Sequence, residues 1–235
     1  MMPTIDIRDT HAYPIMILLS FAAGLLVQYL LGRRRGMTRQ TAGLMALACF
    51  LFPCAGALLL TWITSGGRSF GFSSLGGLVG MYVGGAVVAA AARLPQALTA
   101  RDITLVLPLM YSISKVGCLL AGCCGGRPWD GILSVTYLTE EGTRTVLAVP
   151  LLETICFLMI FLLGMWMHAK GWRYAVHIVF ILAMLTKCGL DFARASHEGQ
   201  LLSLTQILCL VLVLADAAVL VWCQIQRRRM PPFPL

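Results

Sequence analysis

The chain has 235 residues, of which 59% are hydrophobic and 12% are charged, and its formal net charge at pH 7 is +8. This balance and the positive mean hydropathy exclude an ordinary soluble domain and are typical of a protein embedded in a lipid bilayer. We interpret the basic excess as a device that orients the chain in the membrane, and no nucleic-acid partner is expected.

Apolar stretches of about 20 residues follow one another along the chain, each long enough to cross roughly 30 Å of hydrocarbon as a helix. Such continuous runs lack the alternating pattern of a membrane barrel. The predicted spans are 13–32, 42–63, 69–92, 103–126, 146–169, 174–193 and 201–223. The sequence therefore predicts an all-α polytopic membrane protein with seven transmembrane helices, in which residues 1–235 form a single domain.

Lysine and arginine in the short connections indicate the orientation, because they are retained on the cytoplasmic side of a membrane. One side carries most of them, namely Arg33, Arg34, Arg35, Arg39, Arg93, Arg101, Lys170, Arg173, Arg227, Arg228 and Arg229. We therefore expect the N-terminus outside and the C-terminus in the cytoplasm, with 227–235 as a cytoplasmic tail. The longest connection, 127–145, is expected to be an extracytoplasmic loop, either an interfacial hairpin with Glu140 and Glu141 at its polar tip or an unstructured segment.

Charged residues inside two of the spans are the strongest functional signal. Lys115 is the only charge in the fourth span, and a charge at that depth is by default a functional-site hypothesis. Near the end of the sixth span, Lys187, Asp191 and Arg194 share one helix face. These cations favour an anionic ligand. Two structural alternatives stay open, an ion pair between Lys187 and Asp191, and pairing of Lys115 with Asp216 of the seventh span.

Further polar or small residues are predicted to lie in the outer half of the bundle. They are Tyr13, Gly76, Gly77, Arg127, Glu153 and Gln206. The simplest arrangement for them is a polar cavity that opens outward. Glycines spaced by four predict close helix packing in the third span, at Gly76, Gly80 and Gly84, and in the fourth, at Gly122 and Gly126.

The nine cysteines and four histidines are not expected to bind a metal. Cys118, Cys123 and Cys124 are the most suggestive, but side chains five residues apart point in different directions on a continuous helix. The histidines, which include His177 and His197, lie at predicted span ends or in outer segments, where interfacial solvation explains them. No metal and no cofactor are therefore expected.

Taken in order along the chain, these segments resemble the prolipoprotein diacylglyceryl transferases, seven-helix enzymes of the bacterial cytoplasmic membrane. The clearest part is Lys115 to Arg127, KVGCLLAGCCGGR, which is similar to the family signature Arg-x-Gly-Asn-Phe-x-Asn-x-Glu-x-x-Gly-Arg. Weaker similarities to family motifs lie at 12–13, 75–77, 150–153, 187–194 and 205–208.

Several polar positions depart from the family pattern. Lysine replaces arginine at Lys115 and Lys187, cysteine replaces asparagine at Cys118, and cysteine replaces glutamate at Cys123. Further replacements are Leu75 for histidine, Ala121 for asparagine and Asp191 for glutamate. Lysine keeps a positive point charge for a phosphate but loses the planar fork of arginine, which grips two oxygens.

The resemblance implies transfer of a diacylglyceryl group from phosphatidylglycerol to the lipobox cysteine thiol of a prolipoprotein, with release of glycerol phosphate. The implied partners are phosphatidylglycerol, the prolipoprotein signal peptide with its lipobox cysteine, and membrane lipids. We expect catalytic roles for Lys115, Lys187, Asp191, Arg194 and Glu153. Substrate-binding roles are expected for Tyr13, Gly76, Gly77, Gly117, Gly122, Gly126, Arg127 and Gln206.

Two alternatives from other functional classes stay open on the sequence. One is a non-catalytic relative that binds lipid or lipoprotein, because many polar family positions are altered. The other is a membrane thiol oxidoreductase that uses Cys123 and Cys124.

Overall fold

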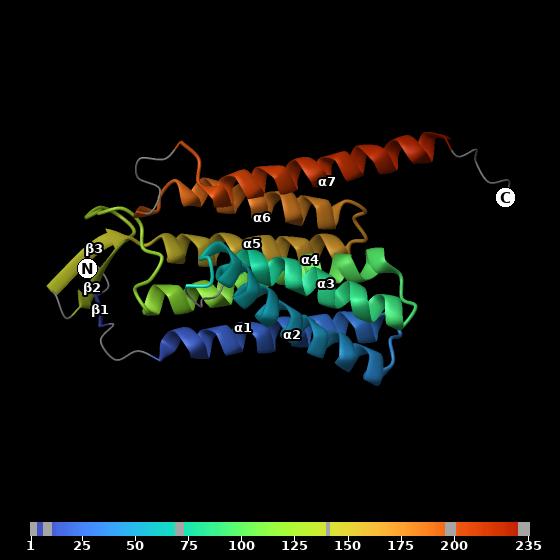
Figure 1. The fold of residues 1–235 in the computed structure, drawn as a ribbon. Helices are drawn as coiled ribbons and strands as arrows, with labels where there is room; N and C mark the ends of the chain where they lie inside the picture. Colours follow the sequence, from blue (N-terminus) through green and yellow to red (C-terminus); the bar gives the residue numbers. More distant parts are fainter. Residues whose placement is uncertain (1–3, 7–10, 69–72, 140–141, 196–200, 230–235) are drawn as a thin grey trace.

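The computed structural model describes residues 4–6, 11–68, 73–139, 142–195 and 201–229. Helices dominate these residues and lie alongside one another as a bundle, with a small sheet at one end (Figure 1). The helices are α1 (Ala12–Arg34), α2 (Arg39–Thr64), α3 (Ser74–Ala91), α4 (Gln96–Leu120), α5 (Val149–Ala169), α6 (Ala175–Asp191) and α7 (Leu204–Arg229).

The sheet has three strands, β1 (Thr4–Asp6), β2 (Ser134–Thr139) and β3 (Gly142–Leu147), in the order β1-β2-β3. Strands β2 and β3 form an antiparallel hairpin, and β1 pairs with β2 in parallel. The Tyr137 hydroxyl donates to the Leu119 carbonyl at 3.0 Å and so fastens the sheet to the end of α4. The hairpin interpretation of the 127–145 connection is thus confirmed, while Glu140 and Glu141 lie outside the described residues.

Six of the described helices are long and apolar enough to cross a membrane by length and composition, and α6, with 17 residues, is not among them. The expected all-α membrane protein is confirmed at this level, with the small sheet as an addition. Helix α4 covers Gln96–Leu120 where 103–126 was expected. Helix α5 begins after the predicted position 146, because the preceding residues pair in β3. Helix α7 includes residues 227–229, which were assigned to the tail.

Glycines bring α2 and α3 into backbone contact. A Cβ atom at Gly76 or Gly80 would collide with the α2 backbone, and one at Gly84 would lie 2.9 Å from the Ala48 carbonyl oxygen. The packing prediction for the third span is therefore confirmed. For the fourth span it is wrong, because α4 has ended before Gly122, whose φ of 65° turns the chain away from the helix axis.

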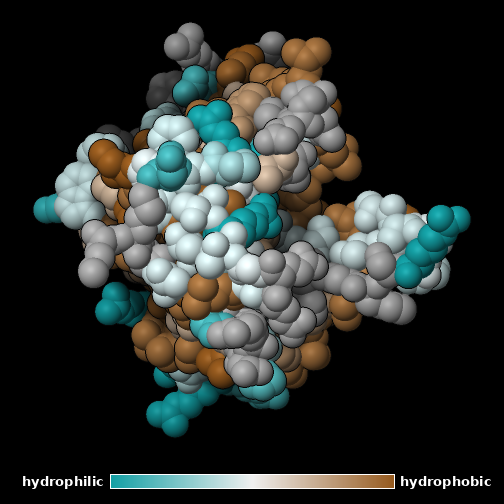
Figure 2. All heavy atoms as spheres, turned by 90° about the vertical axis from the view of Figure 1, so that its left-hand side faces the viewer, coloured by the Kyte–Doolittle hydropathy of each residue, from teal (hydrophilic) through white to brown (hydrophobic). Residues whose placement is uncertain are grey.

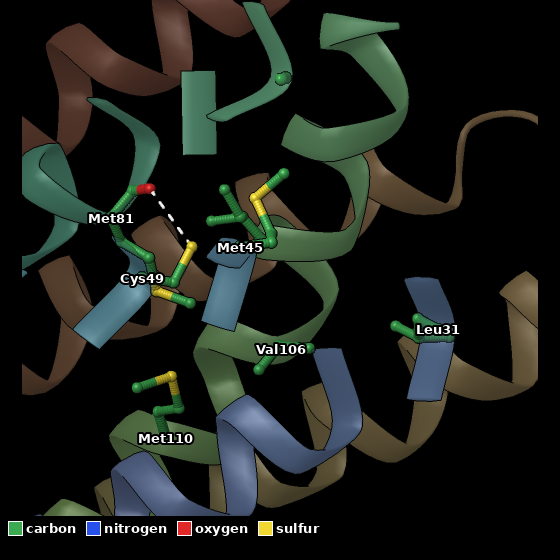
Figure 3. Close-up of a cluster of buried hydrophobic side chains, with 8 residues drawn as sticks. Leu31, Met45, Cys49, Met81, Val106 and Met110 are labelled. Atoms are coloured by element: carbon green, nitrogen blue, oxygen red, sulfur yellow. Dashed lines mark hydrogen bonds between the residues drawn. The ribbon is translucent and has the colours of Figure 1, made fainter. Parts of the chain in front are cut away.

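Helix α4 occupies the middle of the bundle, where it packs against α1, α3, α5 and α6. On one side of it, a sulfur-rich apolar core joins the first four helices, and Figure 3 shows Met45, Cys49 and Met81 gathered there, with the Cys49 thiol 3.9 Å from the Met81 carbonyl oxygen. Because protein surrounds α4 on several sides, Lys115 lies inside the bundle and is only 7% exposed.

Candidate functional site

Cations that are far apart in the sequence converge on one buried carboxylate near the sheet end of the bundle. Glu153 lies in the second turn of α5 and is fully buried. The Lys115 Nζ lies 3.0 Å from its Oε2, and the Arg194 Nη2 lies 2.6 Å from its Oε1. A buried carboxylate needs countercharges because it has lost its hydration. Glu153 therefore holds both cations in fixed positions.

Tyr111 connects a third cation to this carboxylate. Its hydroxyl donates to Glu153 Oε1 at 2.9 Å and accepts a hydrogen bond from Lys187 Nζ at 2.7 Å. The Nζ atoms of Lys115 and Lys187 also lie 5.0 and 4.7 Å from the centroid of its ring, within the range of a cation–π contact. Tyr111 was not predicted as a site residue. Its signal was a tyrosine four residues before Lys115, and so on the same helix face.

Asp191 and Gln206 support the site from behind. The Arg194 Nε lies 3.6 Å from Asp191 Oδ1, and the Ser203 hydroxyl donates to the other oxygen of that carboxylate. Gln206 is fully buried, accepts a hydrogen bond from the Ser203 amide at 2.8 Å and donates to the Cys188 carbonyl at 3.1 Å. These bonds tie the start of α7 to the end of α6. Ser203 was also missed, because a serine between two apolar helices carries no distinctive pattern.

The signature-like segment after α4 connects the sheet to the end of α6. The Gly126 amide donates to the Leu147 carbonyl at 2.9 Å, and the Arg127 amide donates to the Ala193 carbonyl at 3.1 Å. Gly126 must stay a glycine, since a Cβ atom there would lie 2.7 Å from the Leu147 Cβ. The segment therefore fixes the backbone next to Arg194.

A cavity of about 470 Å³ begins at these cations and continues between the helices. One end is polar and includes Tyr13, Lys115, Lys187 and Arg194. The rest is largely apolar, with side chains such as Ile17, Phe21, Leu78, Met81, Leu107, Phe157, Val179, Phe180 and Met184. This volume is within the range of small-molecule sites, and the polarity gradient suits an amphipathic ligand with an anionic head.

The polar end keeps an unbalanced positive charge. Lys115, Lys187 and Arg194 bring three positive charges, and Glu153 and Asp191 bring two negative charges, so one positive charge remains. Burial alone would lower the pKa of Arg194, but the Glu153 carboxylate more than offsets this effect and the pKa is raised. Arg194 therefore stays cationic, and an anion is the natural complement of the site.

The predicted residues fall into two groups. Five of them line the cavity, namely Tyr13, Gly77, Lys115, Lys187 and Arg194. The others lie behind or beside it. Gly117 packs against α1, where a Cβ atom would lie 2.9 Å from the Met16 Cβ. Arg127 is exposed, and its guanidinium lies 5.8 Å from the centroid of the Trp129 ring. The structure thus brings the charged residues together but leaves Arg127 outside the cavity.

One expectation about a polar partner is wrong, and neither of the two structural alternatives left open by the sequence is found in the part of the chain that the structure describes. Asp216 does not pair with Lys115, because its Oδ1 lies 2.8 Å from the His177 Nδ1. His177 is therefore partnered by a carboxylate and not simply solvated, while His197 lies outside the described residues. Lys187 bonds to Tyr111 and, among the described residues, forms no ion pair with Asp191.

The prediction that Cys118 points away from Cys123 and Cys124 is also wrong, because α4 ends between Cys118 and the other two thiols. The ligand atoms of Cys118, Cys123 and Cys124 all lie within 4.8 Å of one another. Cys118 and Cys124 also line the cavity beside Lys115.

The fold and the site define a helical membrane protein with a cavity inside its bundle that is lined by Lys115, Lys187 and Arg194. A model of the family described as prolipoprotein diacylglyceryl transferase matches residues 3–222, and the chain belongs to this family. It is accordingly a transferase of lipoprotein biosynthesis that moves a diacylglyceryl group to prolipoproteins. A search among curated proteins finds no match.

Proposed function

We propose that the cavity binds phosphatidylglycerol through its phosphate and that the diacylglyceryl group passes to the lipobox cysteine thiol of a prolipoprotein signal peptide. One observation carries this proposal, namely the convergence of Lys115, Lys187 and Arg194 at one end of an apolar cavity. A phosphodiester places a single negative charge next to the apolar diacylglyceryl group. That charge balances the one positive charge that the site leaves over.

The same cations favour the chemical step. The client sulfur attacks the terminal glyceryl carbon, a carbon–sulfur bond forms, and the carbon–oxygen bond to phosphate breaks. The released glycerol phosphate takes the bonding electron pair and so gains negative charge as the bond breaks. Fixed cations in a site shielded from water stabilise that developing charge more than they stabilise the ground state.

Roles for individual residues follow from their contacts. Lys115, Lys187 and Arg194 bind the phosphate, while Tyr111 orients both lysines. Glu153 was a candidate base or positioning residue, and positioning is the better assignment because both its oxygens are already engaged by cations or Tyr111.

The remaining predicted residues are assigned to support or substrate contact. Asp191 and Gln206 hold the end of α6, and Tyr13 and Gly77 contact the donor lipid in the cavity. Gly76, Gly117 and Gly126 act through close backbone approach, Gly122 acts through its positive φ, and Arg127 serves the client peptide at the exposed end.

In the proposed setting, residues 1–235 form one seven-span domain in the bacterial cytoplasmic membrane, with the sheet end outside. Figure 2 views the sheet end, where pale and teal polar side chains gather while brown apolar side chains form the flanks. The basic residues that follow α1 lie at the opposite end of the bundle, as expected for the cytoplasmic side. With this orientation, the cations face the leaflet from which an exported prolipoprotein is processed.

The test is transfer by the purified protein. The protein is incubated with phosphatidylglycerol vesicles and a lipobox peptide, and the peptide mass and the released glycerol phosphate are measured. The proposal predicts that the peptide gains one diacylglyceryl group for each glycerol phosphate released. A peptide with serine in place of the lipobox cysteine and vesicles of phosphatidylethanolamine alone are the matched controls. An unmodified peptide alongside bound lipid would support the non-catalytic alternative, and thiol oxidation without lipidation would support the oxidoreductase.

A further inference from the structure

Three thiols form a compact cluster, and two of them, those of Cys118 and Cys124, belong to residues that line the cavity. Cys118 lies in the last turn of α4, and Cys123 and Cys124 follow after the helix has ended. Their ligand atoms all lie within 4.8 Å of one another, and the Cys123 thiol lies 3.7 Å from the Cys118 carbonyl oxygen. Bonds of about 2.3 Å from zinc to sulfur place the sulfurs of a tetrahedral site roughly 3.8 Å apart. Small side-chain rotations would therefore bring these three to one metal ion.

The backbone around the cluster adopts a conformation that side chains rarely take. Gly122 has a φ of 65°, and Cys124 has a φ of 58° although it is not a glycine. Left-handed backbone at a cysteine is disfavoured, and such strain is concentrated at functional sites. Here the strained turn places Cys124 on the cavity wall together with Cys118.

The proposed reaction lacks an obvious acceptor for the thiol proton. Among the described residues that line the cavity there is no aspartate, glutamate or histidine. Glu153 is fully buried and held by two cations and Tyr111. The client thiol therefore needs another means of activation, and the cluster is next to the cations that hold the donor phosphate.

We propose that Cys118, Cys123 and Cys124 bind a zinc ion whose fourth position faces the cavity and accepts the client cysteine as a thiolate. Soft thiolate ligands select zinc, and a zinc site with three protein ligands keeps one position open for water or substrate. Three thiolates and a divalent cation carry one net negative charge, and the cations Lys115 and Arg194 line the same cavity as Cys118 and Cys124. The second half of this proposal rests on the proposed transferase function.

The step balances without an added oxidant or reductant. The client thiol loses its proton to solvent at the exposed end of the cluster and binds zinc as a thiolate, since a metal-bound thiol is deprotonated. Its sulfur then attacks the glyceryl carbon as the carbon–oxygen bond to phosphate breaks. The electron pair of that bond leaves with glycerol phosphate, and the thioether product dissociates from zinc.

The metal site is tested without reference to activity. The full chain is purified with a phosphine reductant, its zinc content is measured, and the site is then reloaded with cobalt. We expect about one metal per chain and the near-ultraviolet absorption of cobalt bound to thiolate. Both signals should be lost in Cys118→Ser and in Cys124→Ser. Both should be kept in the control Cys54→Ser, because Cys54 lies on α2 away from the cluster. A disulfide within the cluster as purified without reductant, or a metal-free protein with no cobalt band, would overturn the site.

The role of the metal is tested separately. Chelation should lower the rate of peptide lipidation at least about tenfold, with recovery when zinc is returned, as is typical when a metal centre is disturbed. Adding client peptide to the cobalt form should shift its absorption, and a peptide with serine in place of cysteine should not. Full lipidation by the metal-free protein would overturn the role of zinc and leave the transferase function intact. Loss of all lipidation in the zinc-loaded wild type would instead count against the transferase function while the metal site stands.

Discussion

Two polar clusters are buried at opposite ends of the bundle, and they differ in the space beside them. The outer cluster, so named from the proposed orientation, lies at the sheet end, where Lys115, Lys187 and Arg194 surround Glu153 and border a cavity of about 470 Å³. The inner cluster lies at the other end, where the Arg35 guanidinium pairs with the Asp102 carboxylate next to a cavity of about 20 Å³. The smaller space has room for about one water molecule.

The different space beside the two clusters shows that similar residue types can have different roles. In the inner cluster, Asp102 is matched by Arg35, while the second cation, Arg101, has a side chain 31% exposed to solvent. No ligand is needed there. In the outer cluster the surplus cation is not exposed in this way, since Lys115 and Lys187 are buried and the Arg194 side chain is 17% exposed, and the space beside them is large. Burial of charge alone therefore does not identify a functional site, whereas unbalanced charge beside a cavity does.

The largest effect is expected from Lys115→Met, which keeps much of the side-chain volume and removes the charge. The lipidation rate should fall at least about 100-fold, because one donor to the developing negative charge is lost. The rate is measured with the lipobox peptide, and gel filtration in detergent checks that the variant is folded. A folded variant with the wild-type rate would remove Lys115 from the mechanism and erase the contrast between the clusters.

Glu153→Gln is expected to have the next largest effect. The cations would keep their positions less well and would repel one another without the carboxylate, so the rate should fall about 10- to 100-fold. Loss of one partner of a buried pair should also lower the free energy of unfolding by about 3 kcal/mol. Rate and thermal unfolding are measured on the same preparation. Unchanged stability would contradict the role of Glu153 as the countercharge.

Lys115→Arg tests whether charge or shape matters at this position. The guanidinium keeps the charge and adds a planar fork for two phosphate oxygens, so the rate should stay within about tenfold of the wild type. The comparison with Lys115→Met under identical conditions isolates the charge. If both variants were equally inactive, the lipidation rate would depend on the shape of the ammonium group and not on its charge.

Asp102→Asn should have the smallest effect on activity, because it alters the inner cluster only. The lipidation rate should stay within about twofold of the wild type, while the free energy of unfolding should fall by about 1 kcal/mol, since Arg35 is partly exposed. A loss of activity comparable to that of Glu153→Gln would show that the two ends are coupled.

Much of the fold could be predicted from hydropathy. Backbone N–H and C=O groups in lipid must be hydrogen-bonded within the protein, so a long apolar run that crosses the membrane forms a helix. The run of apolar residues through Cys123 concealed the end of α4, since neither hydropathy nor the small residues there distinguish a last helical turn from a strained loop. Gly122 was the available signal, as a glycine in the left-handed region often ends a helix.

The charged residues of the candidate site could be selected from the sequence, but the contacts between them could not. Lys115 and Lys187 stand out because a charge in an apolar span is rare, and their positions follow from sequence alone. The partners, Glu153 for Lys115 and Tyr111 for Lys187, could not be assigned, because which helices are neighbours is a property of tertiary packing. The thiol cluster was not predicted because it forms only if α4 ends between Cys118 and Cys123, and the apolar sequence there did not indicate a helix end.

The central claim is that the outer cations hold the phosphate of the donor lipid, and an experimental structure of the protein with bound phosphatidylglycerol tests it most directly. The account predicts the phosphorus density at the polar end of the cavity, with phosphate oxygens about 3 Å from at least two of Lys115, Lys187 and Arg194. A phosphate bound elsewhere, with acyl chains against these cations, would contradict it.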